Sequence, residues 1–141
     1  MSKPEAVCIV CIHPETGEIL AATRPHTTDM WGLIGGKVDP GESPIQAAYR
    51  EFAEETGQAI TSPLAYITTM EDEVDFIVHV FRVMPATEKY IAGRISRDSV
   101  FSVEPNILVS YVPYVKLLNF EPFRLFNTRL LNILLTQTVN A

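Results

Sequence analysis

Apolar residues gather in short blocks along the first part of the chain. Residues 6–12 form a nearly continuous apolar run, which is typical of a strand buried on both faces. Residues 19–23 form a second apolar block after a polar stretch that contains turn-forming Pro and Gly. We therefore expect two strands joined as a hairpin. A polar loop over residues 24–29 then leads to residues 30–34, which return to the core.

The second half of the sequence alternates between strand and helix patterns. Residues 74–84 show the clearest alternation and predict a strand, and shorter segments at 66–69, 99–103 and 108–112 predict further strands. Residues 86–97 have the pattern of a loop with some polar helix character, and residues 113–118 that of a helical turn. Residues 121–135 predict an amphipathic closing helix. Mixed strands and helices are typical of the α/β class.

Between these halves, residues 35–57 combine a glycine-rich loop with a helix. Ser43 suits the N-cap, Pro44 the first turn and Gly57 the position that ends the helix. At about 100° per residue, one helical stripe carries apolar residues that should anchor the helix to the core. These residues are Ile45, Tyr49, Phe52 and Thr56.

A second stripe, about 120° away on the same predicted helix, carries Ala47 and three acidic residues. Glu51, Glu54 and Glu55 stand at positions i, i+3 and i+4, so their carboxylates lie within one turn of each other. Such spacing alone is more often a solvated face. Three neighbouring like charges repel, however, and a divalent cation would neutralise them.

Composition and charge limit the classes of protein. The chain has 141 residues, 47% of them hydrophobic, which fits one globular domain over residues 1–141. The net charge of −6 disfavours stable nucleic-acid or anionic-membrane binding. We find no apolar run long enough to cross a bilayer and no signal peptide, so we expect a cytoplasmic protein.

The two cysteines, Cys8 and Cys11, form a C-x-x-C sequence inside the first predicted strand. Strand positions i and i+3 face opposite sides of a sheet, whereas a redox pair requires the start of a helix. We therefore predict two ordinary buried thiols.

The central segment resembles the signature of the Nudix hydrolases. The matching residues run Gly36-x5-Glu42-x7-Arg50-Glu51-Phe52-x-Glu54-Glu55-x-Gly57, and Gln58 departs from the bulky residue that usually follows. The segments 31–37 and 111–117 resemble the family as well. The resemblance implies an α/β/α sandwich around a mixed β-sheet, with the motif as a loop-helix-loop. It also implies hydrolysis of a nucleoside diphosphate linked to another group X, with Mg²⁺ or Mn²⁺.

Carried over from the family, the resemblance implies roles for the motif residues. Glu51, Glu54 and Glu55 would ligate the metal together with the carbonyl of Gly35, and Glu54 would take the proton from water. Arg50 would orient a glutamate, and Glu42 would brace the loop. A further carboxylate near a late strand is Glu104, with Glu71, Glu73 and Asp75 as alternatives.

Residues outside the motif are candidates for substrate binding. Arg24 and Lys37 flank the expected site and suit phosphate, although single surface cations are common. Trp31 is either a wall of the pocket or a stacking partner for a base. Asn119, or Asn127, would read the edge of a base, since an amide offers paired hydrogen bonds.

Three functions are compatible with these patterns. The first is a pyrophosphohydrolase that converts a nucleoside triphosphate, ordinary or modified, to the monophosphate and pyrophosphate. Hydrolysis of ADP-ribose, nucleotide sugars or dinucleoside polyphosphates is a variant of the same chemistry. A catalytically silent nucleotide sensor is the contrasting class, which the intact glutamates disfavour. We expect a small-molecule substrate and a monomer or homodimer.

Overall fold

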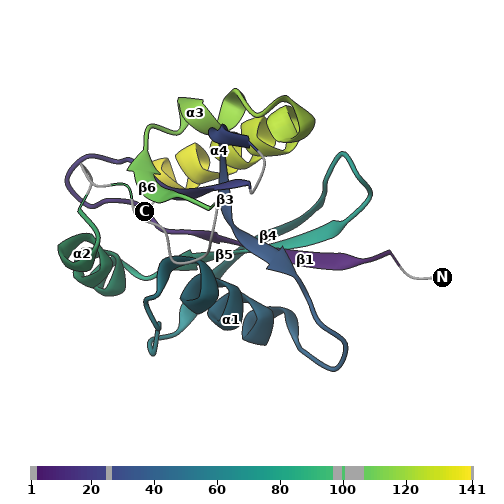
Figure 1. Ribbon diagram of the computed structural model, residues 1–141, viewed down its shortest axis with the longest axis horizontal. Helices are drawn as coiled ribbons and strands as arrows, with labels where there is room; N and C mark the ends of the chain where they lie inside the picture. The colour runs from purple at the N-terminus through teal and green to yellow at the C-terminus, as the bar shows by residue number, and fades with distance from the viewer. Residues whose placement is uncertain (1–2, 25–26, 97–99, 101–106, 141) are drawn as a thin grey trace.

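The computed structural model describes residues 3–24, 27–96, 100 and 107–140, and its centre is a mixed sheet of six strands in the order β4-β5-β1-β3-β2-β6 (Figure 1). Only β1 and β5 run parallel, and the other neighbours are antiparallel. The strands are β1 (Glu5–Val10), β2 (Ile19–Arg24), β3 (Thr27–Lys37), β4 (Leu64–Glu71), β5 (Ile77–Val83) and β6 (Val109–Val112).

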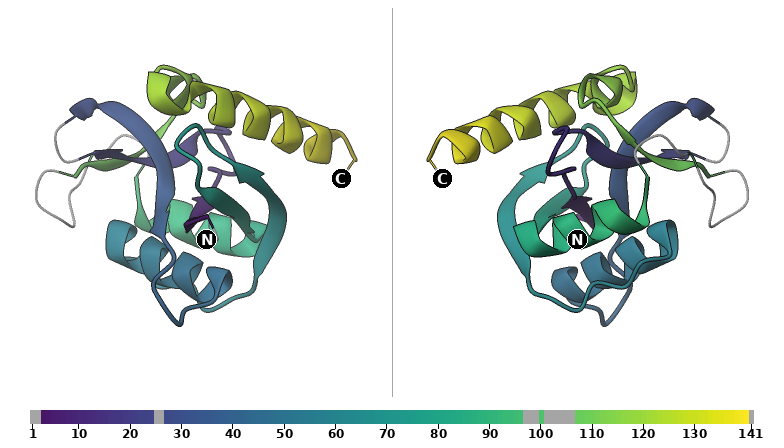
Figure 2. Two further views of the ribbon diagram at one scale, coloured as in Figure 1. Left: turned by 90° about the vertical axis from the view of Figure 1, so that its right-hand side faces the viewer. Right: turned by 90° about the vertical axis from the view of Figure 1, so that its left-hand side faces the viewer.

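Helices cover both faces of this sheet, as the two side views show (Figure 2). The helices are α1 (Pro44–Thr56), α2 (Pro85–Arg94), α3 (Val115–Leu118), the 3₁₀ turn η1 (Glu121–Phe123) and α4 (Arg124–Asn140). One apolar cluster packs α1 and α2 on one face, and a second packs α3 and α4 on the other. The predicted α/β/α sandwich with a mixed sheet is therefore confirmed.

The predicted hairpin of the first two strands is wrong in its pairing. The turn itself exists, since His13 N–H donates to Glu18 O at 2.8 Å and Leu20 N–H to Cys11 O at 2.9 Å. Beyond this turn the two strands separate and β3 lies between them. Pairing with a strand further along the chain thus replaces the local hairpin.

Strand β3 changes partner half-way along its length. Its residues 31–33 pair with β2, whereas Ile34 to Lys37 pair with β1. The segment predicted as a polar loop at 24–29 partly belongs to β3, which begins at Thr27. The change of partner brings the glycines of the motif against β1, and the site is built at that point.

Helix α1 begins and ends where the sequence predicts. The Ser43 hydroxyl accepts a hydrogen bond from Gln46 N–H at 3.2 Å, and the Gln46 side chain accepts one from Ser43 N–H at 2.8 Å. Gly57 ends the helix with φ of 72°. This reciprocal capping satisfies backbone donors that have no partner inside the helix.

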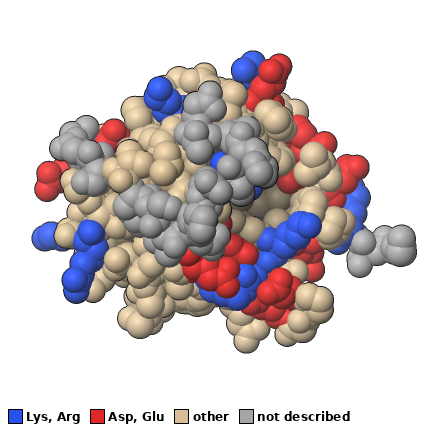
Figure 3. All heavy atoms as spheres, in the orientation of Figure 1, with Lys and Arg blue, Asp and Glu red and all other residues tan. Residues whose placement is uncertain are grey.

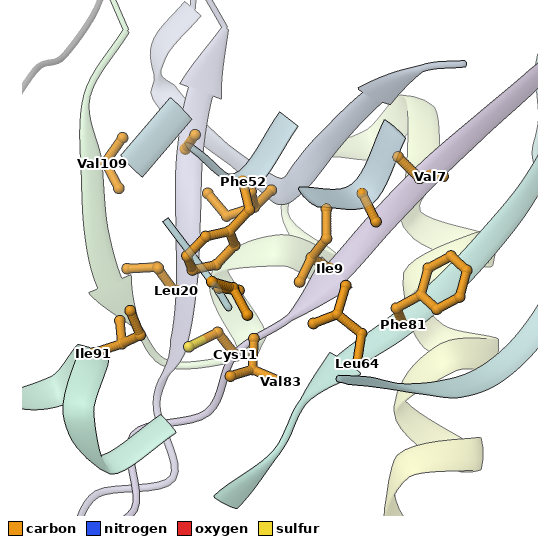
Figure 4. Packing of buried hydrophobic residues seen from close by; sticks show 14 of the residues in the cluster. Val7, Ile9, Cys11, Leu20, Phe52, Leu64, Phe81, Val83, Ile91 and Val109 are labelled. Atoms are coloured by element: carbon orange, nitrogen blue, oxygen red, sulfur yellow. The ribbon is translucent and has the colours of Figure 1, made fainter. Parts of the chain in front are cut away.

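The anchoring face of α1 differs from the predicted stripe at one end. Phe52 points into the core among residues of β1 and β2 (Figure 4), and Ala47, Ala48 and Thr56 are also buried. Ile45, in contrast, is 39% exposed. The small side chains of the two alanines let the helix approach the sheet closely, so the buried face is rotated toward them.

Cys8, in β1, and Cys11, the residue directly after this strand, lie on opposite faces of the sheet, as predicted. Cys11 is in the cluster under α1, and Cys8 packs against the cluster under α4. Burial raises the pKa of each thiol to about 12. Two inert thiols follow from this arrangement.

The remaining predictions along the second half hold where the structure describes the chain. The predicted strands at 66–69, 74–84 and 108–112 correspond to β4, β5 and β6, and the loop with helix character is α2. The closing helix is η1 followed by α4, with Phe126, Leu130 and Leu134 buried. The strand predicted at 99–103 lies outside the described residues, apart from position 100.

Candidate active site

Arg50 is the centre of the acidic cluster on α1. Its guanidinium donates two hydrogen bonds of 2.8 Å to the carboxylate of Glu42, one from Nε and one from an outer nitrogen. Its other outer nitrogen donates to Glu51 at 2.9 Å and to Glu54 at 3.3 Å. One cation therefore holds three glutamates of the loop and helix in a fixed arrangement.

The bidentate ion pair between Arg50 and Glu42 fixes the loop that precedes α1. Arg50 lowers the pKa of Glu42 from 4.5 to about 2, helped by a hydrogen bond from Asp39 N–H to the same carboxylate. Arg50 also donates to the backbone carbonyl of Lys37 at 3.0 Å. The loop of residues 37–42 is thus tied to the middle of the helix, as expected for Glu42 as a brace.

Glu51 lies against the glycine-rich end of β3. A methyl group added at Gly36 would lie 2.5 Å from the Glu51 carboxyl carbon, so only glycine leaves room for this side chain. Burial raises the pKa of Glu51, and the hydrogen bond from Arg50 opposes that effect only in part. A further cation beside Glu51 would favour its ionised form.

Glu55, one helical turn after Glu51, approaches the neighbouring glycine Gly35. Gly35 N–H donates to a carboxylate oxygen of Glu55 at 3.4 Å. A side chain at Gly35 would collide with the Val7 carbonyl of β1, so the close approach of the two strands requires glycine there. Gly35 is therefore in contact with both β1 and the acidic cluster.

The cluster has the chemistry of a hard-cation site. Figure 3 shows acidic side chains gathered closely around basic ones on the face that carries α1. Across the described ranges, no three His, Cys, Asp or Glu side chains are placed to enclose a metal by themselves. Mg²⁺ usually keeps several waters and takes one or two carboxylates plus substrate phosphates, so a closed cage is not needed. The oxygen donors of Glu51 and Glu54 fit that requirement.

A cavity of about 390 Å³ opens beside this cluster. Its floor consists of β1 and β3 residues that include Gly35 and Gly36. Its walls come from the β4–β5 turn and from the segment that contains η1 and the start of α4. The wall residues are Asp72, Val74, Phe76, Phe120, Phe123, Phe126 and Asn127. The volume lies within the range of small-molecule sites.

Both predicted phosphate-binding cations line this cavity. The guanidinium carbon of Arg24 lies 5.8 Å from the ring centres of Phe120 and of Phe123. Lys37 Nζ lies 5.7 Å from the ring centre of Phe76. Each cation is therefore held at the cavity by an aromatic side chain.

The other predicted substrate residues have different positions. Trp31 packs against the apolar cluster under α4, outside the lining of the cavity. Asn119 is exposed at the end of α3, whereas Asn127 is buried and lines the cavity. The Asn127 side-chain amide donates to Leu117 O at 3.2 Å, which directs its nitrogen away and leaves the carbonyl oxygen as its other polar group.

The acids proposed to complete the metal site are dispersed. Glu104 lies outside the described residues. Glu71 accepts from Lys3 Nζ at 2.8 Å, and Asp75 occupies a turn with φ of 65°. Glu73 accepts hydrogen bonds from the first turn of α4. Among the described alternatives, Glu71 and Glu73 thus bind other groups of the protein.

The aromatic wall was not predicted from the sequence. Phe120, Phe123 and Phe126 recur every three residues, a spacing that places them on one side of a helical segment. That spacing was the available signal. It indicated an apolar face of a closing helix without showing that part of this face lines a cavity.

A sequence profile of the NUDIX domain matches residues 2–122. The chain belongs to the Nudix family. Its members generally use a divalent metal ion, which agrees with the acidic cluster of α1. The match ends within η1, so α4 and two of the three phenylalanines of the aromatic wall, Phe123 and Phe126, follow the matched segment.

Relatives of this Nudix chain act on different nucleotides. It is 38% identical over 76 residues to the CTP pyrophosphohydrolase of Escherichia coli, a match that covers 51% of this chain and 56% of that protein. The chain thus spans little more than half of that relative's length. It is 28% identical over 133 residues to an RNA pyrophosphohydrolase of Nitratiruptor, covering 86% of this chain and 84% of the relative.

Solved structures show the same fold. The NUDIX domain of NrtR from Shewanella oneidensis, crystallised with ADP ribose, has a TM-score of 0.68 at 17% identity, covering 98% of this chain and 90% of that one. At this identity the similarity concerns the fold alone. Within the described part of the chain, every helix is too short or too polar to cross a bilayer.

Proposed function

We propose that this Nudix chain is a divalent-metal-dependent nucleotide pyrophosphohydrolase. The proposed substrate is a nucleoside triphosphate, which is hydrolysed to the nucleoside monophosphate and pyrophosphate. One observation carries the proposal: Glu51, which Arg50 holds next to Glu54, lies against Gly36 at the floor of a cavity of about 390 Å³. The names of the two relatives described above, a CTP pyrophosphohydrolase and an RNA pyrophosphohydrolase, support it.

The proposed metal is Mg²⁺, with Mn²⁺ as a substitute, held by Glu51, Glu54 and Glu55 and by the carbonyl of Gly35. When bound, such an ion neutralises phosphate oxygens and lowers the pKa of water. Glu104 stays a prediction as the additional ligand. The raised pKa of Glu51 supports the assignment, because a neighbouring cation would relieve the cost of burying its charge.

The side chains of the protein have separate tasks in the proposed reaction. Arg50 keeps Glu51 and Glu54 in position. Glu54, which is half exposed at the cluster, takes the proton from the attacking water. Oxygen from water bonds to phosphorus, the anhydride P–O bond between the α and β phosphates breaks, and the monophosphate and pyrophosphate together carry the two hydrogens of the water. Arg24 and Lys37 bind the phosphate chain from the cavity walls.

The nucleoside is proposed to occupy the aromatic part of the cavity. Phe76, Phe120 and Phe123 offer ring faces beside the two cations, and stacking on such faces is tolerant of the base. Asn127 is better placed than Asn119 to contact the base, because of these two residues only Asn127 lines the cavity. Trp31 supports the floor through its packing under α4.

The proposed substrate is a small molecule, and the proposed location is the cytoplasm. The net charge of −6 supports the first of these, because stable nucleic-acid binding requires a basic surface. A monomer or homodimer is our proposal for the assembly.

The test is a product assay on the purified chain. CTP, dGTP, 8-oxo-dGTP, ATP, ADP-ribose, a nucleotide sugar and diadenosine tetraphosphate are each incubated with Mg²⁺, and the products are separated by ion-exchange chromatography. We expect a nucleoside monophosphate and pyrophosphate from at least one triphosphate, and no products when EDTA is added. Products from ADP-ribose alone would change the substrate class, and binding without products from any compound would indicate a sensor.

A further inference from the structure

The first turn of α4 receives hydrogen bonds from a side chain about fifty residues earlier. Glu73, in the turn between β4 and β5, accepts from Leu125 N–H and from Phe126 N–H, each at 3.2 Å. The first N–H groups of a helix have no acceptor within the helix, and a carboxylate there is favoured. Glu73 therefore caps α4 from a distant part of the chain.

The turn that carries Glu73 is fixed internally. The Asp72 side chain accepts hydrogen bonds from Val74 N–H at 3.0 Å and Phe76 N–H at 2.9 Å, and Asp72 N–H donates to Phe76 O at 3.0 Å. Asp75 adopts a left-handed conformation within it. Such a turn moves as one body, so a bond made by Glu73 fixes the whole turn relative to its partner.

Both partners of this bond belong to the walls of the cavity. Asp72, Val74 and Phe76 form one wall, and Phe120, Phe123, Phe126 and Asn127 form the other. Figures 1 and 2 show the tip of the β4–β5 hairpin rising to the start of α4. Apolar packing under α4 is non-directional, whereas hydrogen bonds set distance and orientation. The two bonds of Glu73 therefore determine how far apart the walls lie.

We propose that Glu73 is a positioning residue for nucleotide binding, which acts by holding the β4–β5 turn against the start of α4. This inference rests on the proposed function for the identity of the ligand. It also gives Glu73 a role other than metal binding, since its carboxylate is engaged with α4. Without the bond, the turn and the helix move apart and Phe76 no longer faces Phe120 and Phe123 at a fixed distance.

The test compares three variants in steady-state kinetics with CTP and dGTP. Glu73→Ala removes the bond, and we expect KM to rise about tenfold while kcat stays within about twofold. Glu73→Gln keeps an acceptor oxygen, so its KM should remain within about threefold of the unmodified chain. Glu71→Ala removes an equal charge two residues away, where the carboxylate binds Lys3, and should leave KM unchanged.

A second measurement does not depend on turnover. Hydrogen exchange followed by mass spectrometry should show faster exchange in Glu73→Ala at residues 72–76 and at 124–127 together, with no change in Glu71→Ala. Calorimetric binding of CMP and dGMP replaces KM if the chain hydrolyses neither triphosphate, so that failure of the proposed function is seen separately. An unchanged KM or dissociation constant in Glu73→Ala, or a fall in kcat alone, would overturn the proposal.

Discussion

At the scale of residues, Arg50 decides how the acidic cluster is arranged. Its planar guanidinium matches the carboxylate of Glu42 with two bonds of 2.8 Å and still reaches Glu51 and Glu54. A lysine ammonium lacks this fork and could not hold the same three partners. Glu42 is thereby kept ionised as a brace, and Glu51 and Glu54 are kept close together on the open side of the helix.

This pairing gives the stability of the protein a defined pH dependence. Because the pKa of Glu42 is lowered from 4.5 to about 2, its ionised form stabilises the folded state above pH 4.5, and this contribution is lost as pH falls toward 2. In urea unfolding, Glu42→Gln should be less stable than the unmodified chain at pH 7 and pH 5. The difference in unfolding free energy between the two should become smaller below pH 4.5 and disappear near pH 2.

The control for this experiment is Glu15→Gln, an exposed acid in the turn after β1 for which the described residues offer no ion pair. The difference in unfolding free energy between Glu15→Gln and the unmodified chain should not change with pH. A gap for Glu42→Gln that persisted unchanged from pH 7 to pH 2 would contradict the role of its charge.

Two adjacent glycines separate the requirements of the fold from those of the site. A methyl group at Gly35 meets the Val7 backbone carbonyl, whereas one at Gly36 meets the terminal carboxylate of Glu51, which a rotation of that side chain can move away. Gly35→Ala should therefore lower the unfolding free energy by about 2 kcal/mol or more. Gly36→Ala should stay within about 0.5 kcal/mol while it displaces Glu51 and lowers turnover at least about tenfold.

Urea unfolding and initial rates of pyrophosphate release measure the two effects of these glycine variants. Equal loss of stability in both would mean that Gly36 serves the packing of β3. Full activity in Gly36→Ala would mean that the position of Glu51 is unimportant for turnover.

At the scale of elements, α1 presents its acids from a helix whose start is fixed by Ser43. The Ser43 hydroxyl accepts from Gln46 N–H, and its loss leaves that donor without its cap. Ser43→Ala should lower the unfolding free energy by about 1 kcal/mol. Ser43→Asp keeps an acceptor and should lose less than half of that value. Calorimetric unfolding measures the stability of both variants. An equal loss of unfolding free energy in Ser43→Ala and Ser43→Asp would mean that the effect does not come from the capping hydrogen bond.

Local signals were sufficient for α1 and insufficient for the pairing of strands. Ser43, Pro44 and Gly57 act on their own neighbours, and the helix they delimit follows from the sequence. The predicted hairpin of β1 and β2 is wrong because β3, the next strand along the chain, pairs with both. Ile45 is exposed because the small Ala47 and Ala48 approach the sheet instead.

The candidate site also has one part that local sequence signals indicate and another that depends on tertiary packing. The acidic cluster follows from spacing within α1 and its loop, so the sequence indicates it directly. The cavity wall depends on how residues 120–127 pack against the sheet, and the sequence shows only their apolar spacing. Glu73 illustrates the limit, because its partners at Leu125 and Phe126 could be found only from tertiary structure.

At the scale of the whole molecule, the sandwich places the proposed catalytic acids and the proposed nucleotide pocket on different layers. Helix α1 carries the acids on one face of the sheet, and η1 with α4 supplies aromatic walls on the other. The Gly35–Gly36 end of β3 touches both. The chain carries a net charge of −6, yet Arg24 and Lys37 bring positive charge to the cavity, which suits a phosphate chain.

This division predicts that the acids control turnover and the cavity controls affinity. The decisive measurement is the rate of monophosphate and pyrophosphate formation by Glu54→Gln, with Mg²⁺ and substrate both saturating and with Glu15→Gln as the matched control. The account predicts that kcat falls by about a hundredfold or more in Glu54→Gln, with KM changed less than about threefold, and that Glu15→Gln equals the unmodified chain. Undiminished kcat in Glu54→Gln would contradict the assignment of the acidic cluster as the catalytic centre.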